Sequence, residues 1–481
     1  MTEPLAFGER QNGMDRRTFL TAALAGPALL AILEACGSES KSSSTTHPGS
    51  TSTPVAPTTD PTASTTVTST ASSTPANAGE ARSSKSRAAA STGDAAQAIN
   101  VINDFGVDMY HRLAAPASAD SASGTTNLVF SPVSIALALA MTRGGAAGTT
   151  AGEMDAVLHV GDPATMPHSM NALTTELEAR TKTVEIPGAE PTNVELSIAN
   201  SLWAQQGLAF ETAFLDLLAT EYGAGLQLVD YKSDPDGARV LINQWVDAAT
   251  KDRIPELLAP GVITPDARLT LVNAIYMKAA WETAFEKQLT LPGPFTTGAG
   301  KTVQAPMMSR SDHLRYASTS GWQAVVLPYV GGDLSMVIML PDEAAPLGAT
   351  ADALAGLDGQ LGPQLVNLTM PKFDIETSVG LAGVLGAMGM PTAFDPSAAD
   401  FSGMTKDEEL FIAAVIHQAN ITVDEEGTEA AAATAVVMET TAAPLDPPQP
   451  IDFVVDRPFL FAIRDNTTSA ILFLGHISDP S

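Results

Sequence analysis

The sequence predicts an α+β fold for the larger part of the chain. Apolar residues at helical spacing dominate residues 94–252, and β-branched and aromatic residues at strand spacing dominate residues 269–477. No proline-rich or serine-rich linker and no internal repeat divides residues 94–481, so we expect one large domain there. Helices that come mainly first and strands that come mainly second favour an α+β domain over alternating βαβ units.

The first 36 residues have the pattern of an export signal. A charged start, MDRRTFL, precedes an apolar run at Thr18–Leu33 that is too short for a membrane span and contains Pro27. Arg16 and Arg17 resemble the start of a twin-arginine signal. The letters LEAC resemble the lipobox of bacterial lipoproteins and make Cys36 the expected lipidation site, with a plain signal peptide as the alternative.

Residues 37–93 are predicted to form a disordered tether. They are rich in Ser, Thr, Pro and Ala, contain almost no aromatic side chains, and cannot bury enough apolar surface to order themselves. Cys36 is the only cysteine, so an internal disulfide is excluded and the fold must rest on its core. We expect an exported protein: either an extracellular protein, or a cell-surface lipoprotein that meets the membrane only through a lipid anchor.

The negative charge of the chain lies in its body. Residues 1–93 contain seven basic and seven acidic residues, so the net charge of −29 falls on residues 94–481, with 18 basic against 47 acidic residues. Nucleic acids and other polyanions are therefore poor partners. A solvated acidic surface that keeps the protein soluble is a sufficient explanation for this charge.

The helices follow from periodicity and capping residues. Asp94–Leu113 carries apolar residues at helical spacing. The next helix begins with Ser131 as its cap and Pro132 in its first turn, where the missing N–H of proline costs nothing. Two further helices are expected near residues 211–222 and 236–252.

The later segments favour strands. Residues 269–277, LTLVNAIYM, are rich in strand-forming side chains. Residues 324–340 read as two strands joined at Gly331–Asp333, and residues 459–477 form a second hairpin that turns at Asp465–Ser469.

Motifs for catalysis, metals and cofactors are absent from the sequence. It contains no G-x-S-x-G nucleophile elbow and no H-E-x-x-H pair, and its seven histidines are scattered. Residues 296–302, TTGAGKT, lack the first glycine of a phosphate loop because Phe295 occupies that position. We therefore expect no enzyme activity, no metal and no cofactor.

Residues 424–444, DEEGTEAAAATAVVMETTAAP, could form either a helix or a strand. The alanine run favours a helix, whereas Gly427 and the later β-branched residues do not. As a strand, the segment places Thr428 and other uncharged side chains on one face, and it directs Glu429 and Glu439 to water on the other. Gly427 would act as a hinge, and residues 443–450 as an exposed, proline-stiffened loop.

The body of the chain resembles the serpin family. The segment DEEGTEAAAATAVV matches the hinge of the serpin reactive-centre loop almost letter for letter. Other serpin motifs follow in family order over residues 95–481: NLVFSPVSIALALAM (127–141), TLVNAIYMKAAWETAFEK (270–287), APMMSR (305–310), VNLTMPKFDIE (366–376) and DRPFLFAIRDNTTSAILFLGHI (456–477).

The resemblance implies a serpin domain at residues 94–481 with three β-sheets, about nine helices and a reactive-centre loop at about 425–450. Serpins mostly trap serine or cysteine proteases: the protease cleaves the loop, and the loop then inserts into the central sheet before the acyl-enzyme is hydrolysed. Native serpins are thus kinetically trapped. We expect a monomer that inhibits proteases.

The resemblance also assigns roles to residues. The family's shutter positions, polar groups under the central sheet, fall on Ser134, Asn273 and His417, and Trp281 matches the breach, where the loop first enters the sheet. The hinge and inserting strand comprise Glu425, Gly427, Thr428, Glu429, Ala430, Ala431, Ala432, Ala433 and Thr434.

The family places the scissile bond fourteen residues beyond the hinge glycine, which gives Thr441–Ala442. The small residues there imply an elastase-like or subtilisin-like target. The helix that would carry a heparin site, near residues 165–182, has only Arg180 and Lys182, so no heparin-like polyanion is expected. Two alternatives remain: a non-inhibitory carrier or chaperone, and a surface adhesion lipoprotein that uses the fold as a rigid body.

Overall fold

The structure described is a computed structural model. The described residues are 79–115, 126–186, 188, 190–342, 345–429 and 449–481. The predicted export signal with Cys36, the segment Ala430–Thr434 and the bond Thr441–Ala442 lie outside them.

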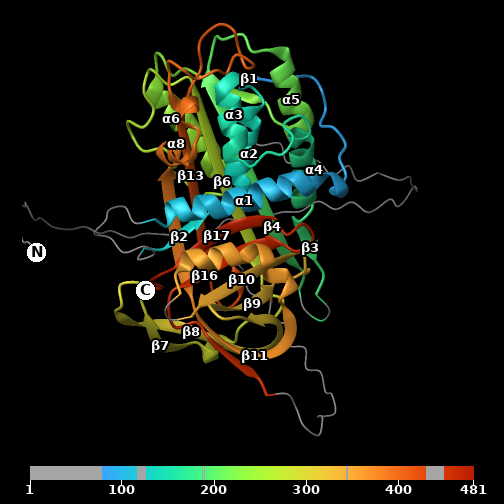
Figure 1. The fold of residues 1–481 in the computed structure, drawn as a ribbon, viewed down its shortest axis with the longest axis vertical. Coiled ribbons are helices and arrows are strands. Elements are labelled where there is room, and N and C mark those ends of the chain that lie inside the picture. Colours follow the sequence, from blue (N-terminus) through green and yellow to red (C-terminus); the bar gives the residue numbers. More distant parts are fainter. Residues whose placement is uncertain (1–78, 116–125, 187, 189, 343–344, 430–448) are drawn as a thin grey trace, which may run out of the picture. The chain divides into compact units, whose positions relative to one another are not determined.

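Eight α-helices lie within the described residues, and most occur in the first half of the chain (Figure 1). They are α1 (Ala96–Leu113), α2 (Pro132–Arg143), α3 (Gly148–Val157), α4 (Met166–Glu178), α5 (Thr212–Tyr222), α6 (Pro235–Ala249), α7 (Leu347–Asp352) and α8 (Ala382–Met388). The predicted start of α2 is confirmed, because the Ser131 side chain accepts a hydrogen bond from the Ser134 backbone N–H at the helix N-terminus.

An eight-stranded sheet forms the centre of the fold. Its strands are, in order, β1 (Gly79–Ala81), β5 (Leu226–Val229), β4 (Thr192–Gln205), β6 (Leu269–Ala280), β14 (Gly427–Thr428), β13 (Ile412–Val423) and β12 (Phe373–Gly380), with β3 (Lys182–Val184) paired to β4. Most neighbours are antiparallel, but β6 and β13 pair in parallel over part of their length. Helix α2 packs on one face of β4 and β6, and α6 packs on the other.

A nine-stranded network contains the predicted hairpins. Its strands are, in order, β15 (Ile451–Val454), β11 (Gly362–Pro371), β8 (Thr302–Ser318), β9 (Trp322–Pro328), β10 (Leu334–Pro341), β16 (Phe459–Asp465), β17 (Ile471–Ile477) and β2 (Leu128–Phe130), with β7 (Leu291–Thr296) paired to β8. The long strand β8 pairs with β11 through residues 307–316 and with β9 through residues 315–318. Two of the three expected sheets are therefore joined into one hydrogen-bonded network.

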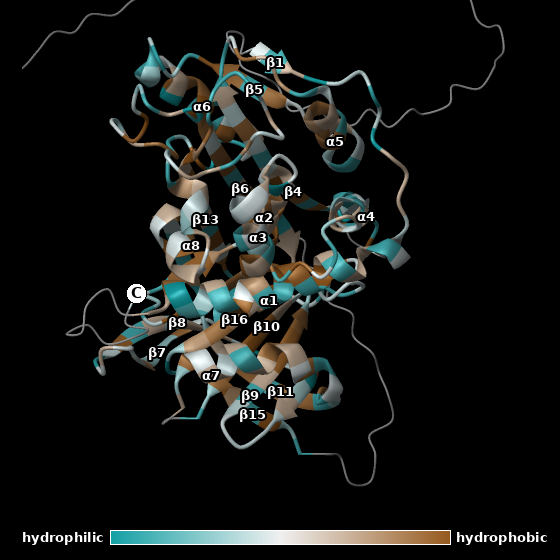
Figure 2. Ribbon diagram, turned by 45° about the horizontal axis from the view of Figure 1, so that its top comes forward, coloured by the Kyte–Doolittle hydropathy of each residue, from teal (hydrophilic) through white to brown (hydrophobic). Residues whose placement is uncertain are grey.

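The core is built mainly by strand residues. Every residue of β10, β16 and β17 is buried, and Figure 2 shows apolar colour along β9 and β10. A second apolar cluster lies under α6, where Trp203 and Trp245 meet edge to face. Because the chain has no internal disulfide, burial of apolar surface is its main source of stability. Each Å² of apolar surface removed from water contributes about 25 cal/mol.

The predicted tether, residues 37–93, was given an end that lies too late in the sequence. Residues 79–93 are part of the fold, because β1 pairs with β5 and Ala88 donates its backbone N–H to Thr220 of α5. Composition suggested disorder since these residues are too polar to build a core. They are ordered instead by hydrogen bonds and ion pairs to the body of the protein.

Candidate functional site

The start of the hinge segment already lies within the central sheet. The two residues of β14 pair with Ala279 and Ala280 of β6, and Thr428 also pairs with Val423 of β13. Gly427 has φ +154°, a backbone conformation that favours glycine. The hinge glycine and the residue that follows it thus form a strand between β6 and β13.

The direct pairing between β6 and β13 stops several residues short of β14. Their parallel pairing covers residues 269–274 of β6 and 412–418 of β13. Within the described part of the chain, no ladder pair joins Ile275–Lys278 of β6 to Ala419–Thr422 of β13. We call these two segments the unpaired stretch, and β14 lies at one end of it.

Trp281, the residue assigned to the breach by the motif match, contacts the hinge segment. Its indole Nε1 donates to the carbonyl of Asp424 at 2.9 Å, and its backbone N–H donates to the carbonyl of Glu426 at 2.9 Å. Its ring stacks on Tyr329 with centroids 4.5 Å apart, and the Tyr329 hydroxyl lies 2.7 Å from the Thr428 hydroxyl. These contacts fix the point at which the segment enters the sheet.

Glu425 is a second anchor of the hinge. Its buried carboxylate accepts hydrogen bonds from Lys372 Nζ at 2.8 Å and from the Thr290 hydroxyl at 2.7 Å. Burial alone would raise the pKa of Glu425, but these two hydrogen bonds outweigh it and lower the pKa. Glu425 is therefore held as an anion beside the entry point.

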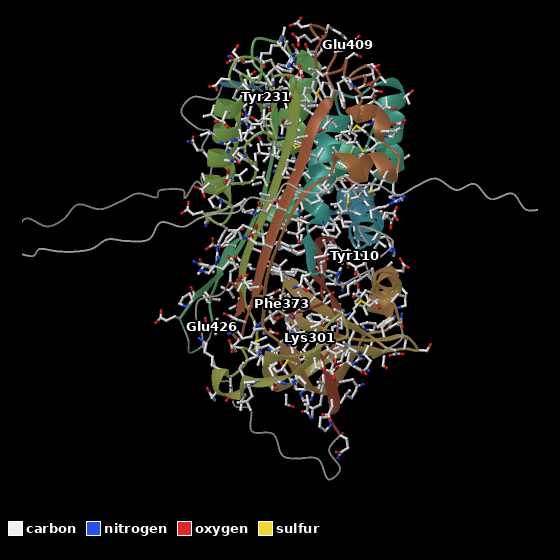
Figure 3. The ribbon with its side chains drawn as sticks, turned by 90° about the vertical axis from the view of Figure 1, so that its left-hand side faces the viewer. Tyr110, Tyr231, Lys301, Phe373, Glu409 and Glu426 are labelled. Atoms are coloured by element: carbon white, nitrogen blue, oxygen red, sulfur yellow. The ribbon has the colours of Figure 1, made fainter. Side chains whose placement is uncertain are left out.

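The next acidic residues extend the anchoring. Figure 3 shows Glu426 beyond the end of β13, whereas Glu409 lies before its beginning. The carboxylate of Glu426 pairs with Lys287, and that of Glu429 pairs with Arg253 at 3.0 Å. The expectation that Glu429 points to water is wrong for this structure, because its side chain is only 4% exposed. Its φ of +51° departs from the extended backbone on which that expectation was based.

The three predicted shutter residues lie together in one buried cluster. His417 accepts the backbone N–H of Ser131 at Nε2, at 3.0 Å, and its Nδ1 contacts the amide oxygen of Asn273. The Ser134 hydroxyl donates to Asn200 Oδ1 at 3.0 Å, and Asn200 stands opposite Asn273 on the neighbouring strand. The cluster thus joins α2 to three strands of the central sheet: β4, β6 and β13.

The cluster is buried and incompletely hydrogen-bonded. His417, Asn273 and Ser134 are fully buried, and burial lowers the pKa of His417 to about 3. The amide nitrogens of Asn200 and Asn273 have no hydrogen-bond partner among the described residues. Unsatisfied buried donors cost free energy, so this part of the sheet is less tightly held than an apolar core would be.

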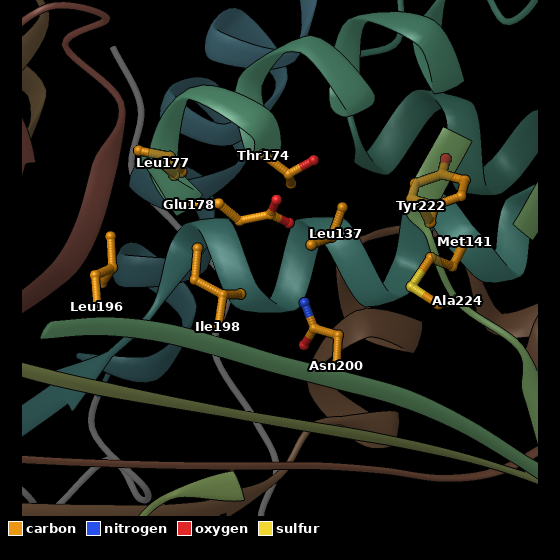
Figure 4. Close-up of a pocket in the computed structure, with 10 residues that line it drawn as sticks. All are labelled: Leu137, Met141, Thr174, Leu177, Glu178, Leu196, Ile198, Asn200, Tyr222 and Ala224. Carbon is orange, nitrogen blue, oxygen red and sulfur yellow. The ribbon is translucent and has the colours of Figure 1, made fainter. Parts of the chain in front are cut away.

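Sequence reasoning missed Asn200 and the partners of the hinge. Asn200 had a detectable signal, since it is a polar residue among the apolar side chains Leu196, Ile198 and Leu202 that alternate along one face of β4. Figure 4 shows its amide nitrogen directed into a small pocket. The pocket is lined by Leu137, Met141, Thr174, Leu177, Glu178, Leu196, Ile198, Asn200, Tyr222 and Ala224. Lys372, Thr290 and Tyr329 gave no such signal, because only the fold brings them to the hinge.

The shutter cluster and the hinge are separate sites on the same strand. Asn273 lies six residues before Ala279 on β6, which corresponds to about 20 Å along a strand. The unpaired stretch lies between them. A strand added to the sheet from β14 would therefore run toward the shutter cluster.

Comparison with known proteins identifies the family. A family model described as "Serpin (serine protease inhibitor)" matches residues 100–480. The chain belongs to the serpin family. It is 36% identical over 392 residues to leukocyte elastase inhibitor A of Rattus norvegicus, covering 78% of this chain and 97% of that protein. It is also 36% identical over 388 residues to Iris of Ixodes ricinus, covering 79% of this chain and 98% of that protein.

Solved structures agree with this family assignment. The crystal structure of the thermophilic serpin tengpin in its native state aligns with a TM-score of 0.70 and 27% identity, covering 82% of this chain and 97% of that one. The predicted serpin fold is thereby confirmed. Serpins are typically serine protease inhibitors and generally not enzymes.

The described residues of this serpin contain no group of three or more His, Cys, Asp or Glu side chains arranged to hold a metal ion. None of the described helices is long and apolar enough to cross a bilayer.

Proposed function

We propose that this serpin inhibits serine proteases by a suicide-substrate mechanism. The observation that carries the proposal is the hinge: β14 lies between β6 and β13 at one end of the unpaired stretch. Cleavage of the loop would free the segment after Thr428 to continue this strand along β6. The attached protease would be carried with it and distorted before its acyl-enzyme is hydrolysed.

The loop sequence points to the class of protease. The proposed reactive bond, Thr441–Ala442, lies outside the described residues and is surrounded by small residues. A protease with a deep basic or aromatic-binding pocket would find no side chain to fill it, which favours elastase-like or subtilisin-like enzymes. Two of the relatives found are named leukocyte elastase inhibitor A, which agrees with this choice. Cysteine proteases with the same preference are further candidates.

Incubation with an elastase-like serine protease tests the proposal. We expect a covalent complex that survives boiling in detergent, and a released C-terminal peptide that begins at Ala442, within two residues, by mass spectrometry. A catalytically inactive protease serves as the control and should give no complex. Complete turnover to cleaved protein, with no covalent complex at any ratio, would contradict the inhibitory mechanism.

A non-inhibitory carrier or surface adhesion protein is the alternative function. Such serpins often have bulky or charged hinge residues, whereas Thr428 is small and is seated between two strands. The segment that follows it is a run of alanines. These features favour inhibition, and the incubation with elastase distinguishes the two functions.

Polyanions are not proposed as partners. Arg180 pairs with the buried Asp465, and Lys182 pairs with Asp333, so both cations near the predicted heparin-site helix are already neutralised within the fold. The excess of acidic residues in the body adds a general repulsion of nucleic acids. We expect the serpin to act as a monomer.

We further propose that the serpin is exported and held at the membrane by lipid on Cys36. The support is the sequence pattern at residues 1–36 and the polar segment that separates Cys36 from β1. Wild type should partition into the detergent phase, and Cys36→Ser should lose this behaviour. Equal aqueous partitioning of both proteins would favour secretion without an anchor.

A further inference from the structure

Glu429 is an ionisable residue in an unfavourable position. Its side chain is 4% exposed, and its backbone has φ +51°, which non-glycine residues rarely adopt. Its Oε2 lies 3.0 Å from Arg253 Nη2 but has no hydrogen-bond partner among the residues that the structure describes. Its backbone N–H donates to the carbonyl of Thr422 at 3.3 Å, which places Glu429 directly at the unpaired stretch.

Arg253 belongs to a segment attached to both sides of the unpaired stretch. This segment follows α6, and the Arg253 carbonyl accepts a hydrogen bond from Asn420 of β13 at 3.4 Å. Two residues earlier, Lys251 pairs with Glu195 of β4, the strand that neighbours β6. Ile254 is fully buried and anchors the segment in the cluster under α6.

Other charged and titratable groups also face Glu429. They are Tyr276 and Lys278 of β6 and Asp374 of β12, in addition to Arg253. Burial raises the pKa of Glu429 above its ordinary value near 4.5, and the attraction of Arg253 does not fully offset this effect. The ionised carboxylate is thus less stable in this site than it would be in water.

We propose that Arg253 is a positioning residue for the trapping reaction and holds the Glu429 carboxylate beside the unpaired stretch until the sheet opens. The inference rests on the proposed function, since it concerns insertion of the same loop. Inserting a strand moves β13 away from β4 by about 4.8 Å, so the segment around Arg253 cannot keep both of its attachments. Arg253 then leaves Glu429, and the unpaired carboxylate reaches water as its backbone becomes extended.

The test measures spontaneous insertion of the uncleaved loop in the full chain without protease. The readout is the first-order rate at which incubated protein loses its capacity to trap elastase while its melting temperature rises. Arg253→Met leaves the carboxylate unpaired and should raise this rate about fivefold. Glu429→Gln removes the charge and should lower the rate. The double variant should behave like Glu429→Gln, because Arg253 acts only through that charge.

Two further variants serve as controls. Arg253→Lys keeps the charge and should restore a rate near that of wild type. Arg315→Met removes an arginine of similar exposure, 48% against 47%, whose partner Asp358 is remote from the hinge, and should leave the rate unchanged. If Arg253→Met and the double variant insert their loops at the same rate, the loss of Arg253 acts independently of the Glu429 carboxylate, and the proposal is wrong.

The rate of spontaneous loop insertion in wild type, measured as a function of pH, gives an independent readout that requires no variant of Arg253. The intact form binds a proton at Glu429 more tightly than a solvent-exposed glutamate would, because the pKa is raised. Lowering the pH toward 4.5 should therefore reduce the insertion rate of wild type relative to that of Glu429→Gln at the same pH, since protonation of the buried histidines affects both proteins alike. Identical profiles for the two proteins would overturn the proposal. If intact wild type does not trap elastase and its loop-cleaved form gains no thermal stability, the proposed function itself fails, which is a distinct result.

Discussion

His417 is kept as a neutral base by its surroundings. Its ring lies in the shutter cluster, where it accepts the Ser131 backbone N–H and contacts Asn273. A cationic imidazolium could not accept that hydrogen bond and would be an unpaired charge in a buried site. The neutral ring therefore helps to hold α2 against β6 and β13.

This burial predicts an acid-sensitive native state. Since burial lowers the pKa of His417 from 6.5 to about 3, the unfolded chain binds a proton in this range while the native protein does not. The free energy of unfolding should fall by up to about 1.4 kcal/mol per pH unit as the pH drops through this window. Urea denaturation at several pH values, for wild type and His417→Gln, measures the effect.

The difference between the two proteins isolates the contribution of His417. Burial also lowers the pKa of His476, to about 4, which adds a slope of the same sign in both proteins. Over pH 4–6.5, the free energy of unfolding should change less steeply with pH in His417→Gln than in wild type. An equal pH dependence in the two proteins would mean that the His417 imidazole is not the group that titrates.

Thr428 determines whether the hinge can enter the sheet. It is buried, and its hydroxyl lies 2.7 Å from that of Tyr329. Thr428→Arg would bring an unpaired charge to this site at a cost of several kcal/mol. Loop insertion should therefore become slower than hydrolysis of the acyl-enzyme. We expect cleaved protein in place of covalent complex on a denaturing gel.

The conservative variant Thr428→Ser keeps the hydroxyl and provides the control. It should trap protease with the stoichiometry of wild type. If Thr428→Arg also traps with unchanged stoichiometry, the inward-facing assignment of this position is wrong.

At the scale of elements, residues 79–91 form a strap across the outer side of β5, α5 and α4. Its central contact is Arg87, whose guanidinium donates to Asn171 Oδ1 at 2.6 Å and forms an ion pair with Glu178 at 2.7 Å. Lys85 pairs with Asp216 of α5. The strap thus uses basic side chains to bind an acidic body.

Arg87→Ala should lower the free energy of unfolding by about 1–3 kcal/mol, because buried acceptors on α4 would lose a charged donor. Arg82→Ala is the matched control: its side chain is 48% exposed, and its ion pair with Glu80 should contribute little. Urea denaturation of both variants measures the difference. An equal loss in both would show that the strap is not held by Arg87.

At the scale of the whole molecule, cutting the loop should stabilise the protein. Insertion would pair the main chain of a new strand with β6 and β13 along the unpaired stretch, and each added hydrogen bond contributes about 1 kcal/mol net. Most proteins lose stability when nicked, so the prediction opposes the usual result. The melting temperature should rise after limited cleavage within residues 440–443, measured by calorimetry.

Cleavage at an exposed site outside the loop is the control for this experiment and should give no rise. A loop-cleaved form that melts at or below the intact protein would show that the loop does not insert. The trapping mechanism would then be untenable for this chain.

The sequence predicted those features that depend on neighbouring residues or on recurring motifs. The start of α2 follows from Ser131 and Pro132, and the hairpin at residues 324–340 follows from two strand-forming apolar runs joined at Gly331–Asp333. The serpin motifs also located Ser134, Asn273 and His417, which the structure brings into one cluster. Local chemistry sufficed here because caps, turns and strand periodicity act over a few residues.

The tertiary structure alone decided which distant groups meet. Lys372, Arg253 and Asn200 are ordinary in the sequence, and only the fold brings them to Glu425, Glu429 and Ser134. Order at residues 79–93 likewise depends on partners more than 80 residues away, such as Glu178. The physical reason is that burial and charge pairing depend on distance in space, so no local pattern can reveal that Glu429 is shielded from water or that a polar segment is ordered.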